Sequence, residues 1–115
     1  MSAEHPYTPA YDDDGVVYVS GALSVDGDGR AVAGRRQALE AAVTKLRERL
    51  GTVGLDLPDV VKTTYFVTDV TLRDEANVHY SEIFAEPRPA RSFVEVSRLP
   101  YGATVEIEAV ARRRA

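Results

Sequence analysis

The chain has 115 residues, which is enough for one domain with a single core, residues 1–115, but too few for two. Its 44% hydrophobic and 28% charged residues are typical of a folded globular protein and unlike a disordered one. The absence of cysteine excludes disulfides, a thiolate nucleophile and thiolate metal sites, and the net charge of -4 argues against a nucleic-acid backbone as the main partner.

The first third of the chain predicts an arm, a strand and a turn. Residues 1–10 contain two prolines and little apolar periodicity, which indicates an extended arm. The run Val16–Ala22 begins with residues that are apolar on both faces, which favours a strand covered on both sides, as in an oligomer. The segment Val25–Arg30 places glycines beside aspartates and is interpreted as a turn that links two strands, with its glycines at positive φ.

Two helices and a strand are expected in the middle of the chain. After Gly34, helical spacing relates Leu39, Ala42, Val43, Leu46 and Leu50, and Gly51 is a plausible C-cap. The β-branched and aromatic run Val61–Val67 favours a strand. Thr71 followed by Asp74 resembles a capping box, which opens a helix with the apolar stripe Leu72, Ala76, Tyr80, Ile83 and Phe84 and is closed by Pro87 and Pro89.

The last third predicts two strands, Arg91–Val96 and Thr104–Ala111, joined by a turn at Leu99–Gly102. In the first strand Ser92, Val94 and Val96 share one face, and in the second Val105, Ile107 and Ala109 do so. We expect these apolar faces to meet the helices. The resulting order is β-β-α-β-α-β-β, an α+β architecture with both helices on one side of a sheet and a charged face on the other.

Arg91 and Glu106 are the residues on which chemistry could rest, although the pattern alone favours a simpler role for each. An arginine on the polar face of a strand is more often the cross-strand partner of a glutamate than a ligand anchor, and Glu106 is more often such a partner than a general base. Tyr7 in the arm is more often a packing residue. Asn77 and His79 are interpreted as surface or interface positions.

We expect neither a metal nor a membrane segment. The histidines His5 and His79 lie far apart and have no second histidine or paired carboxylates at ligand spacing. No apolar stretch approaches the roughly 18 residues of a membrane span, and the first residues lack the features of a signal peptide, which makes the cytoplasm the expected location. The basic run Arg112–Arg114 is interpreted as a solvated end.

One long motif changes the interpretation of Arg91 and Glu106. The run Pro89–Pro100, Pro-Ala-Arg-Ser-Phe-Val-Glu-Val-Ser-Arg-Leu-Pro, followed by Val105–Ala111, Val-Glu-Ile-Glu-Ala-Val-Ala, resembles the signature of the RidA/YjgF family, also known as the L-PSP endoribonuclease-like family. The resemblance extends upstream to Val60–Thr64, Val67–Asp69, the Asn77–Phe84 helix and Val19–Gly21, so that it covers nearly the whole chain.

The resemblance implies a chorismate-mutase-like fold of the bacillus type, with one mixed sheet, assembled as a homotrimer in which the sheets face inward. It implies a cofactor-independent deaminase that hydrolyses reactive 2-imino and enamine acids, such as 2-aminoacrylate or 2-iminobutanoate, to 2-oxo acids and ammonia. Two alternatives stay open: a non-enzymatic ligand-binding or regulatory trimer, and a pathway-specific deaminase that acts on a larger imine.

Carried over to this sequence, the resemblance assigns Arg91 to the substrate carboxylate and Glu106 to the attacking water. It places Tyr7, Ser20, Gly21 and Phe93 in the substrate pocket, where backbone groups near Gly21 and Phe93 could hold the imine nitrogen. Two residues depart from the family pattern. Phe93 stands where many members have cysteine, serine or threonine, and Ala22 stands where glutamine is frequent, so we expect both to alter the pocket and the choice of substrate.

Overall fold

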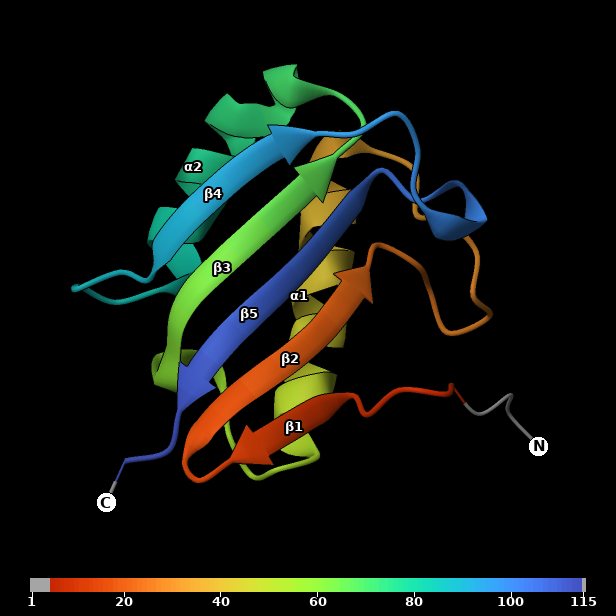
Figure 1. The fold of residues 1–115 in the computed structure, drawn as a ribbon. Helices are drawn as coiled ribbons and strands as arrows, with labels where there is room; N and C mark the ends of the chain where they lie inside the picture. Colours follow the sequence, from red (N-terminus) through yellow and green to blue (C-terminus); the bar gives the residue numbers. More distant parts are fainter. Residues whose placement is uncertain (1–4, 115) are drawn as a thin grey trace.

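The computed structural model describes residues 5–114, in which two helices cover one face of a five-stranded sheet (Figure 1). The order β-β-α-β-α-β-β and the α+β architecture predicted from the sequence are confirmed. The strands are β1 (Ala10–Asp13), β2 (Val16–Leu23), β3 (Val60–Val67), β4 (Ala90–Glu95) and β5 (Val105–Arg112), and the helices are α1 (Arg35–Gly51) and α2 (Arg73–Ile83). Short 3₁₀ helices lie at Leu57–Asp59, Val70–Leu72 and Pro100–Gly102.

The sheet is mixed and its strand order is β1-β2-β5-β3-β4. All neighbouring strands are antiparallel except β3 and β4. These two are parallel because α2 carries the chain back to the end of the sheet at which β3 begins. Figure 1 shows β4 at one edge of the sheet with α2 behind it. An edge strand beneath a helix leaves room for a cleft that opens to solvent.

The core lies between α1 and the central strands. The predicted stripe of α1 is confirmed, because Leu39, Ala42, Val43, Leu46 and Leu50 are all buried. The alternation predicted for the last strand is also confirmed, since Val105, Ile107 and Ala109 of β5 are buried beneath the helices. Each buried leucine or isoleucine side chain stabilises the fold by about 1.5–3 kcal/mol through the loss of apolar surface to water.

The first two strands are joined differently from the expectation. The hairpin between β1 and β2 turns at Asp14 and Gly15, whose φ angles are 54° and 96°. An Asp-Gly pair is a strong hairpin signal because both central residues of such a turn adopt positive φ. The segment Val25–Arg30 does form a turn, with Gly29 at φ 77°, but it closes only a single bridge between Val25 and Ala31. The prediction that it links two strands was therefore wrong.

Both helix ends also differ in detail. Helix α1 includes Gly51, and the glycine with positive φ after it is Gly54. Ahead of α2 the capping residue is Asp69, whose carboxylate accepts hydrogen bonds from the backbone N–H and the hydroxyl of Thr71. The predicted capping role of Thr71 is wrong, because Thr71 donates to the capping carboxylate instead of accepting a hydrogen bond.

Strand β4 faces the opposite way from the expectation. Arg91 pairs with Thr63 and Phe93 pairs with Tyr65, and both β3 partners are buried on the helix side. Val94, which the alternation assigned to the helix side, is 40% exposed. The prediction assumed that the more apolar face of a strand lies inward, but β4 turns its arginine toward α2.

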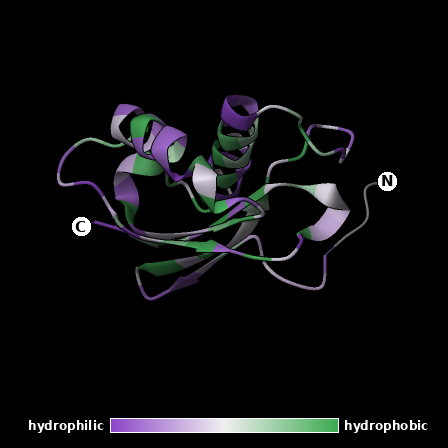
Figure 2. Ribbon diagram, turned by 90° about the horizontal axis from the view of Figure 1, so that it is seen from above, coloured by the Kyte–Doolittle hydropathy of each residue, from purple (hydrophilic) through white to green (hydrophobic). Residues whose placement is uncertain are grey.

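The face of the sheet away from the helices is uncovered (Figure 2). Tyr11 and Tyr18 pair across β1 and β2 on this face and are 60% and 51% exposed. Val94 of β4 adds a further exposed apolar side chain to it. A sheet face with exposed aromatic and β-branched residues is characteristic of a surface that binds another protein surface. No helix in the described part of the chain is long and apolar enough to cross a membrane.

His79 of α2 is buried within the chain, with an exposed fraction of 4%, so the expected surface or interface position was wrong for this residue. Its Nδ1 atom has no hydrogen-bond partner among residues 5–114. Burial is the main reason why the pKa of His79 lies below its ordinary value of 6.5, and the nearby positive charge of Arg36 lowers it further. The fold therefore holds His79 in its neutral form.

Because the pKa of His79 is lowered in the folded state, its neutral form contributes stability above about pH 6.5 that is lost as the pH falls through the folded pKa. We expect the free energy of unfolding to decrease between about pH 7 and 5.5, with a slope of at most about 1.4 kcal/mol per pH unit. Urea unfolding at several pH values measures this slope. It should be smaller in His79→Gln but unchanged in His5→Gln, which alters an exposed histidine; an equal slope in all three proteins would contradict the prediction.

Candidate functional site

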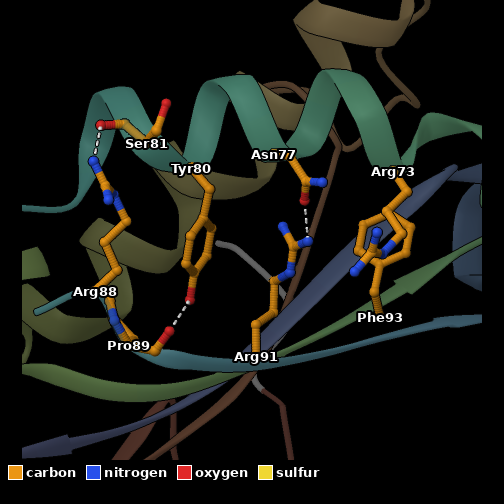
Figure 3. A pocket seen from close by; sticks show the side chains of 8 residues that line it. All are labelled: Arg73, Asn77, Tyr80, Ser81, Arg88, Pro89, Arg91 and Phe93. Atoms are coloured by element: carbon orange, nitrogen blue, oxygen red, sulfur yellow. Dashed lines mark hydrogen bonds between the residues drawn. The ribbon is translucent and has the colours of Figure 1, made fainter. Parts of the chain in front are cut away.

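A cleft of about 520 Å³ lies between α2 and β4 on the helix side of the sheet. Figure 3 shows side chains from α2 on one wall and side chains from β4 and the preceding loop on the other. The cleft exists because β4 is the edge strand, so that α2 overhangs it without a further strand beyond. Its lining residues are Arg73, Asn77, Tyr80, Ser81, Arg88, Pro89, Arg91 and Phe93.

Arg91 occupies the centre of the cleft and points from β4 toward α2 (Figure 3). Its Nη2 atom donates a hydrogen bond to the side-chain oxygen of Asn77. Its Nη1 atom is buried and has no acceptor in the described part of the chain. A buried donor without an acceptor costs about 1–3 kcal/mol, so this atom marks the place where a ligand oxygen would stabilise the site.

Three aromatic rings surround the Arg91 guanidinium. Its Cζ atom lies 4.8 Å from the ring centroid of Tyr80, 4.9 Å from that of Phe93 and 5.3 Å from that of Tyr65. These rings attract the cation through their negative faces, but they offer it no hydrogen-bond acceptor. Burial lowers the pKa of Arg91 from its ordinary value, although the guanidinium stays protonated at neutral pH. The arrangement favours an anionic ligand.

Tyr80 is held in place by two contacts of its hydroxyl group. The Tyr80 hydroxyl lies 2.7 Å from the hydroxyl of the buried Thr63 and donates to the carbonyl of Pro89 at 3.3 Å. Burial raises the pKa of Tyr80, so the hydroxyl keeps its proton. Since Pro89 directly precedes β4, these bonds tie α2, β3 and the start of β4 together at the cleft.

Glu106 lies on the other face of the sheet. It pairs with Leu23 of β2 and Phe66 of β3, whereas the buried residues on either side of it in β5 face the helices. A Cβ atom at Gly21 would meet the end of the Glu106 side chain, so any larger residue at this position would displace the carboxylate from its place against β2. Burial, and secondarily the charge of Glu108, raise the pKa of Glu106 above its ordinary value of 4.5.

The N-terminal arm passes close to this second group. Ser20 donates a side-chain hydrogen bond to the carbonyl of Thr8 at 2.7 Å, which fastens the arm beside β2. Tyr7 is 46% exposed, and the guanidinium carbon of Arg49 lies 5.7 Å from its ring centroid. Ser20 thus holds the arm at Thr8, and Gly21 lies against the Glu106 carboxylate, whereas Tyr7 contacts Arg49 of α1.

The predicted site residues are thus divided within one copy of the chain. Arg91 and Phe93 line the cleft on the helix side, whereas Glu106, with Gly21 against its carboxylate, lies on the other face of the sheet. Ala22 is fully buried opposite Ile107 and does not line this cleft, so its expected effect on the substrate pocket stays a prediction.

The cleft also contains residues that the sequence did not single out for binding. Asn77 is exposed, as expected for a surface or interface position, and it also accepts a hydrogen bond from the Arg91 guanidinium. Tyr80 was expected only in an apolar stripe, and its ring lies against the same guanidinium. The spacing Arg73, Asn77, Tyr80 places all three on one face of α2, and this mixed polar face is the signal by which they could have been found. No group of three or more His, Asp or Glu side chains within residues 5–114 is arranged to hold a metal ion.

Comparisons with known proteins bear on the whole chain. A protein family described as Endoribonuclease L-PSP matches residues 1–113. A Salmonella typhimurium protein named 2-iminobutanoate/2-iminopropanoate deaminase is 39% identical over 117 residues, which cover 95% of this chain and 88% of that protein. The Homo sapiens protein of the same name is 35% identical over 108 residues, which cover 92% and 79%. The crystal structure of RidA from an Antarctic Psychrobacter species matches with a TM-score of 0.88 and 30% identity, covering 96% of this chain and 91% of that one.

The hydroxyl of Tyr80 should contribute to stability separately from its ring. In Tyr80→Phe the ring still faces Arg91, but the buried Thr63 hydroxyl loses its partner, so we expect the free energy of unfolding to fall by about 1–3 kcal/mol. Urea denaturation measures the change. Tyr18→Phe is the matched control because Tyr18 is half exposed, and its stability should stay close to that of the wild type. Equal effects of the two substitutions would contradict the assigned role.

Proposed function

Because this chain belongs to the Endoribonuclease L-PSP family, also called the RidA/YjgF family, we propose that it is a cofactor-independent deaminase that hydrolyses small 2-imino acids to 2-oxo acids and ammonia. The relatives from Salmonella typhimurium and Homo sapiens are named for this activity on 2-iminobutanoate and 2-iminopropanoate. Their alignments with this chain include both Arg91 and Glu106, since they cover at least 92% of its length.

The observation that carries the proposal is the Nη1 atom of Arg91, which is buried in an open cleft and lacks an acceptor within residues 5–114. A planar guanidinium binds a carboxylate through two parallel hydrogen bonds, and every 2-imino acid carries a carboxylate beside its reactive carbon. Asn77 accepts a hydrogen bond from the other terminal nitrogen, Nη2, and so fixes the orientation of the guanidinium in the cleft. Arg91 thus positions the carbon that water attacks.

Hydrolysis of an imine requires neither a covalent nucleophile nor an electron acceptor. Water adds to the carbon of the protonated C=N group, the water loses a proton, and the resulting carbinolamine expels ammonia to leave the 2-oxo acid. In the proposal, Glu106 accepts the proton of the attacking water, which accelerates such a step by about 10²–10⁴-fold. Its raised pKa suits this role, because a base is most effective when its pKa approaches the working pH.

A complete site takes its residues from two copies of the chain. Arg91 and Glu106 project from opposite faces of one sheet, so in a single copy the carboxylate anchor and the base do not face a common space. The exposed apolar residues of the uncovered face, among them Tyr18 and Val94, supply a surface for association. We propose a homotrimer in which Arg91 and Phe93 of one copy meet Glu106, Gly21, Ser20 and Tyr7 of another.

We expect Arg91→Ala to lower kcat/KM by about a hundredfold, because it removes the charge-assisted bonds to the substrate carboxylate. We expect Glu106→Gln to lower kcat by about 10²–10⁴-fold with a smaller effect on KM. Ammonia release from 2-iminobutanoate, formed in the assay by an amino-acid oxidase, measures both. Arg30→Ala and Glu48→Gln, which change exposed residues of the same types that do not line the cleft, are the controls and should retain turnover. Wild-type rates of ammonia release in Arg91→Ala would contradict the proposal. Cleavage of RNA by the wild-type protein without ammonia release from the imine would contradict it as well.

The division of the site between copies predicts complementation. Arg91→Ala and Glu106→Gln should each be inactive alone, but a mixture that is unfolded and refolded together should regain about a quarter of the wild-type activity, since one neighbouring pair in four then combines an intact Arg91 with an intact Glu106. The same mixture without refolding is the control and should stay inactive. No recovery in mixed oligomers would show that the two residues act within one copy or do not act together.

A further inference from the structure

The cleft carries more positive charge than one carboxylate can neutralise. Arg73, Arg88 and Arg91 all line it, and none of the eight lining residues is acidic. Three guanidinium groups around one small cleft repel one another, and the charge of Arg73 contributes to the lowered pKa of Arg91. A ligand with a single carboxylate leaves part of this repulsion in place.

Arg88 and Arg73 differ in whether other residues pair with their guanidinium groups. Arg88 forms an ion pair with Glu86 at 3.5 Å and lies near the carbonyl of Ser81. In the described part of the chain no ion pair involves Arg73, although other arginines on the helix side, such as Arg35 and Arg36, are paired with carboxylates. Besides Arg91, Arg73 is therefore the guanidinium in the cleft whose charge no carboxylate of residues 5–114 neutralises.

The spacing of Arg73 and Arg91 suits a short ligand with two anionic ends. Arg73 precedes Asn77 by four residues, and a helix rises about 6 Å over that interval. Asn77 accepts a hydrogen bond from the Arg91 guanidinium, so Arg73 lies one turn of α2 ahead of the residue that Arg91 contacts. Figure 3 shows Arg73 and Phe93 together at one end of the cleft, with Arg91 next to them and Arg88 at the other end.

We propose that this site prefers a 2-imino acid whose side chain ends in a second carboxylate, and that Arg73 is the residue that determines this preference. The inference rests on the proposed function, in which Arg91 holds the carboxylate beside the reactive carbon. The second carboxylate then reaches Arg73, while the methylene groups between the two lie against the ring of Phe93. A small hydroxyl or thiol at position 93 would leave that stretch of the ligand without an apolar surface.

An exposed arginine at a helix start would by itself indicate nothing about a ligand. The inference depends on its position in the same cleft as a buried, unsatisfied guanidinium nitrogen, and on the absence of acidic side chains from the cleft lining. Arg91 and Arg73 together therefore match the two charges of a dicarboxylate.

Product binding tests the preference without requiring turnover. Isothermal titration of the wild-type oligomer with 2-oxoglutarate and with 2-oxobutyrate should give about tenfold tighter binding of the dicarboxylate, as expected for one further charge-assisted contact. Arg73→Gln should bring the ratio of the two dissociation constants close to one. Arg30→Gln, which removes an equal charge from the exposed turn at residues 26–30, should keep the ratio of the wild type.

Equal or weaker binding of 2-oxoglutarate by the wild type, or a ratio that survives Arg73→Gln, would overturn the inference. The inference would also be overturned if Arg88→Gln removed the preference for 2-oxoglutarate and Arg73→Gln kept it. Ammonia release from the imines of glutamate and 2-aminobutyrate separates the two proposals. Preferential binding of the dicarboxylate without ammonia release from either imine would support the inference and contradict the deaminase, whereas ammonia release with no preference would do the reverse.

Discussion

The parallel pairing of β3 with β4 is the constraint from which the site follows. It aligns Arg91 with Thr63 and Phe93 with Tyr65, and so turns the arginine toward α2 instead of toward the uncovered face. Since a side chain two residues away always shares the same face, Phe93 accompanies Arg91 into the cleft. A shift of one residue in this register would move both to the other side of the sheet and bring Ser92 and Val94 beneath α2. The Thr63–Tyr80–Pro89 contacts oppose such a shift, because they join both strands to the helix.

The alternation of side chains between the two faces of a sheet also separates Arg91, the proposed carboxylate anchor, from Glu106, the proposed base. β5 pairs with β3 so that Ile107 faces the core, which leaves its neighbour Glu106 on the other face, and no rotation about side-chain bonds brings a carboxylate through a sheet. Under the proposed function, a monomer would therefore bind a carboxylate at Arg91 without hydrolysing its imine. In the proposed trimer, association creates the enzyme from two incomplete surfaces, and the exposed apolar residues of the uncovered face stabilise that association.

Much of the fold could be predicted because it depends on local patterns with one physical cause. The stripe of α1 and the alternation of β5 follow from apolar burial, and both are observed. The side of the sheet to which each β4 side chain points could not be predicted in the same way. In this strand the position at the sheet edge, beneath a helix, outweighs the burial of apolar residues. His79 escaped prediction because its burial depends on the packing of α2 against the rest of the fold. The hydrogen-bond partner of Arg91 could not be predicted from the sequence either. Asn77 lies 14 residues away and comes near Arg91 only because α2 carries the chain back across the sheet to β4.

The burial of Arg91 has opposite effects on stability and on binding. A guanidinium nitrogen without an acceptor costs the empty protein about 1–3 kcal/mol, whereas an apolar side chain at this position would carry no such penalty. The aromatic rings that exclude water from the guanidinium also lower the local dielectric constant, which strengthens its attraction to an incoming carboxylate. A solvated arginine on the uncovered face would be less costly but would bind a small anion weakly, because water would compete for every donor. The desolvation that weakens the empty fold is therefore also what allows a single arginine to hold a small carboxylate.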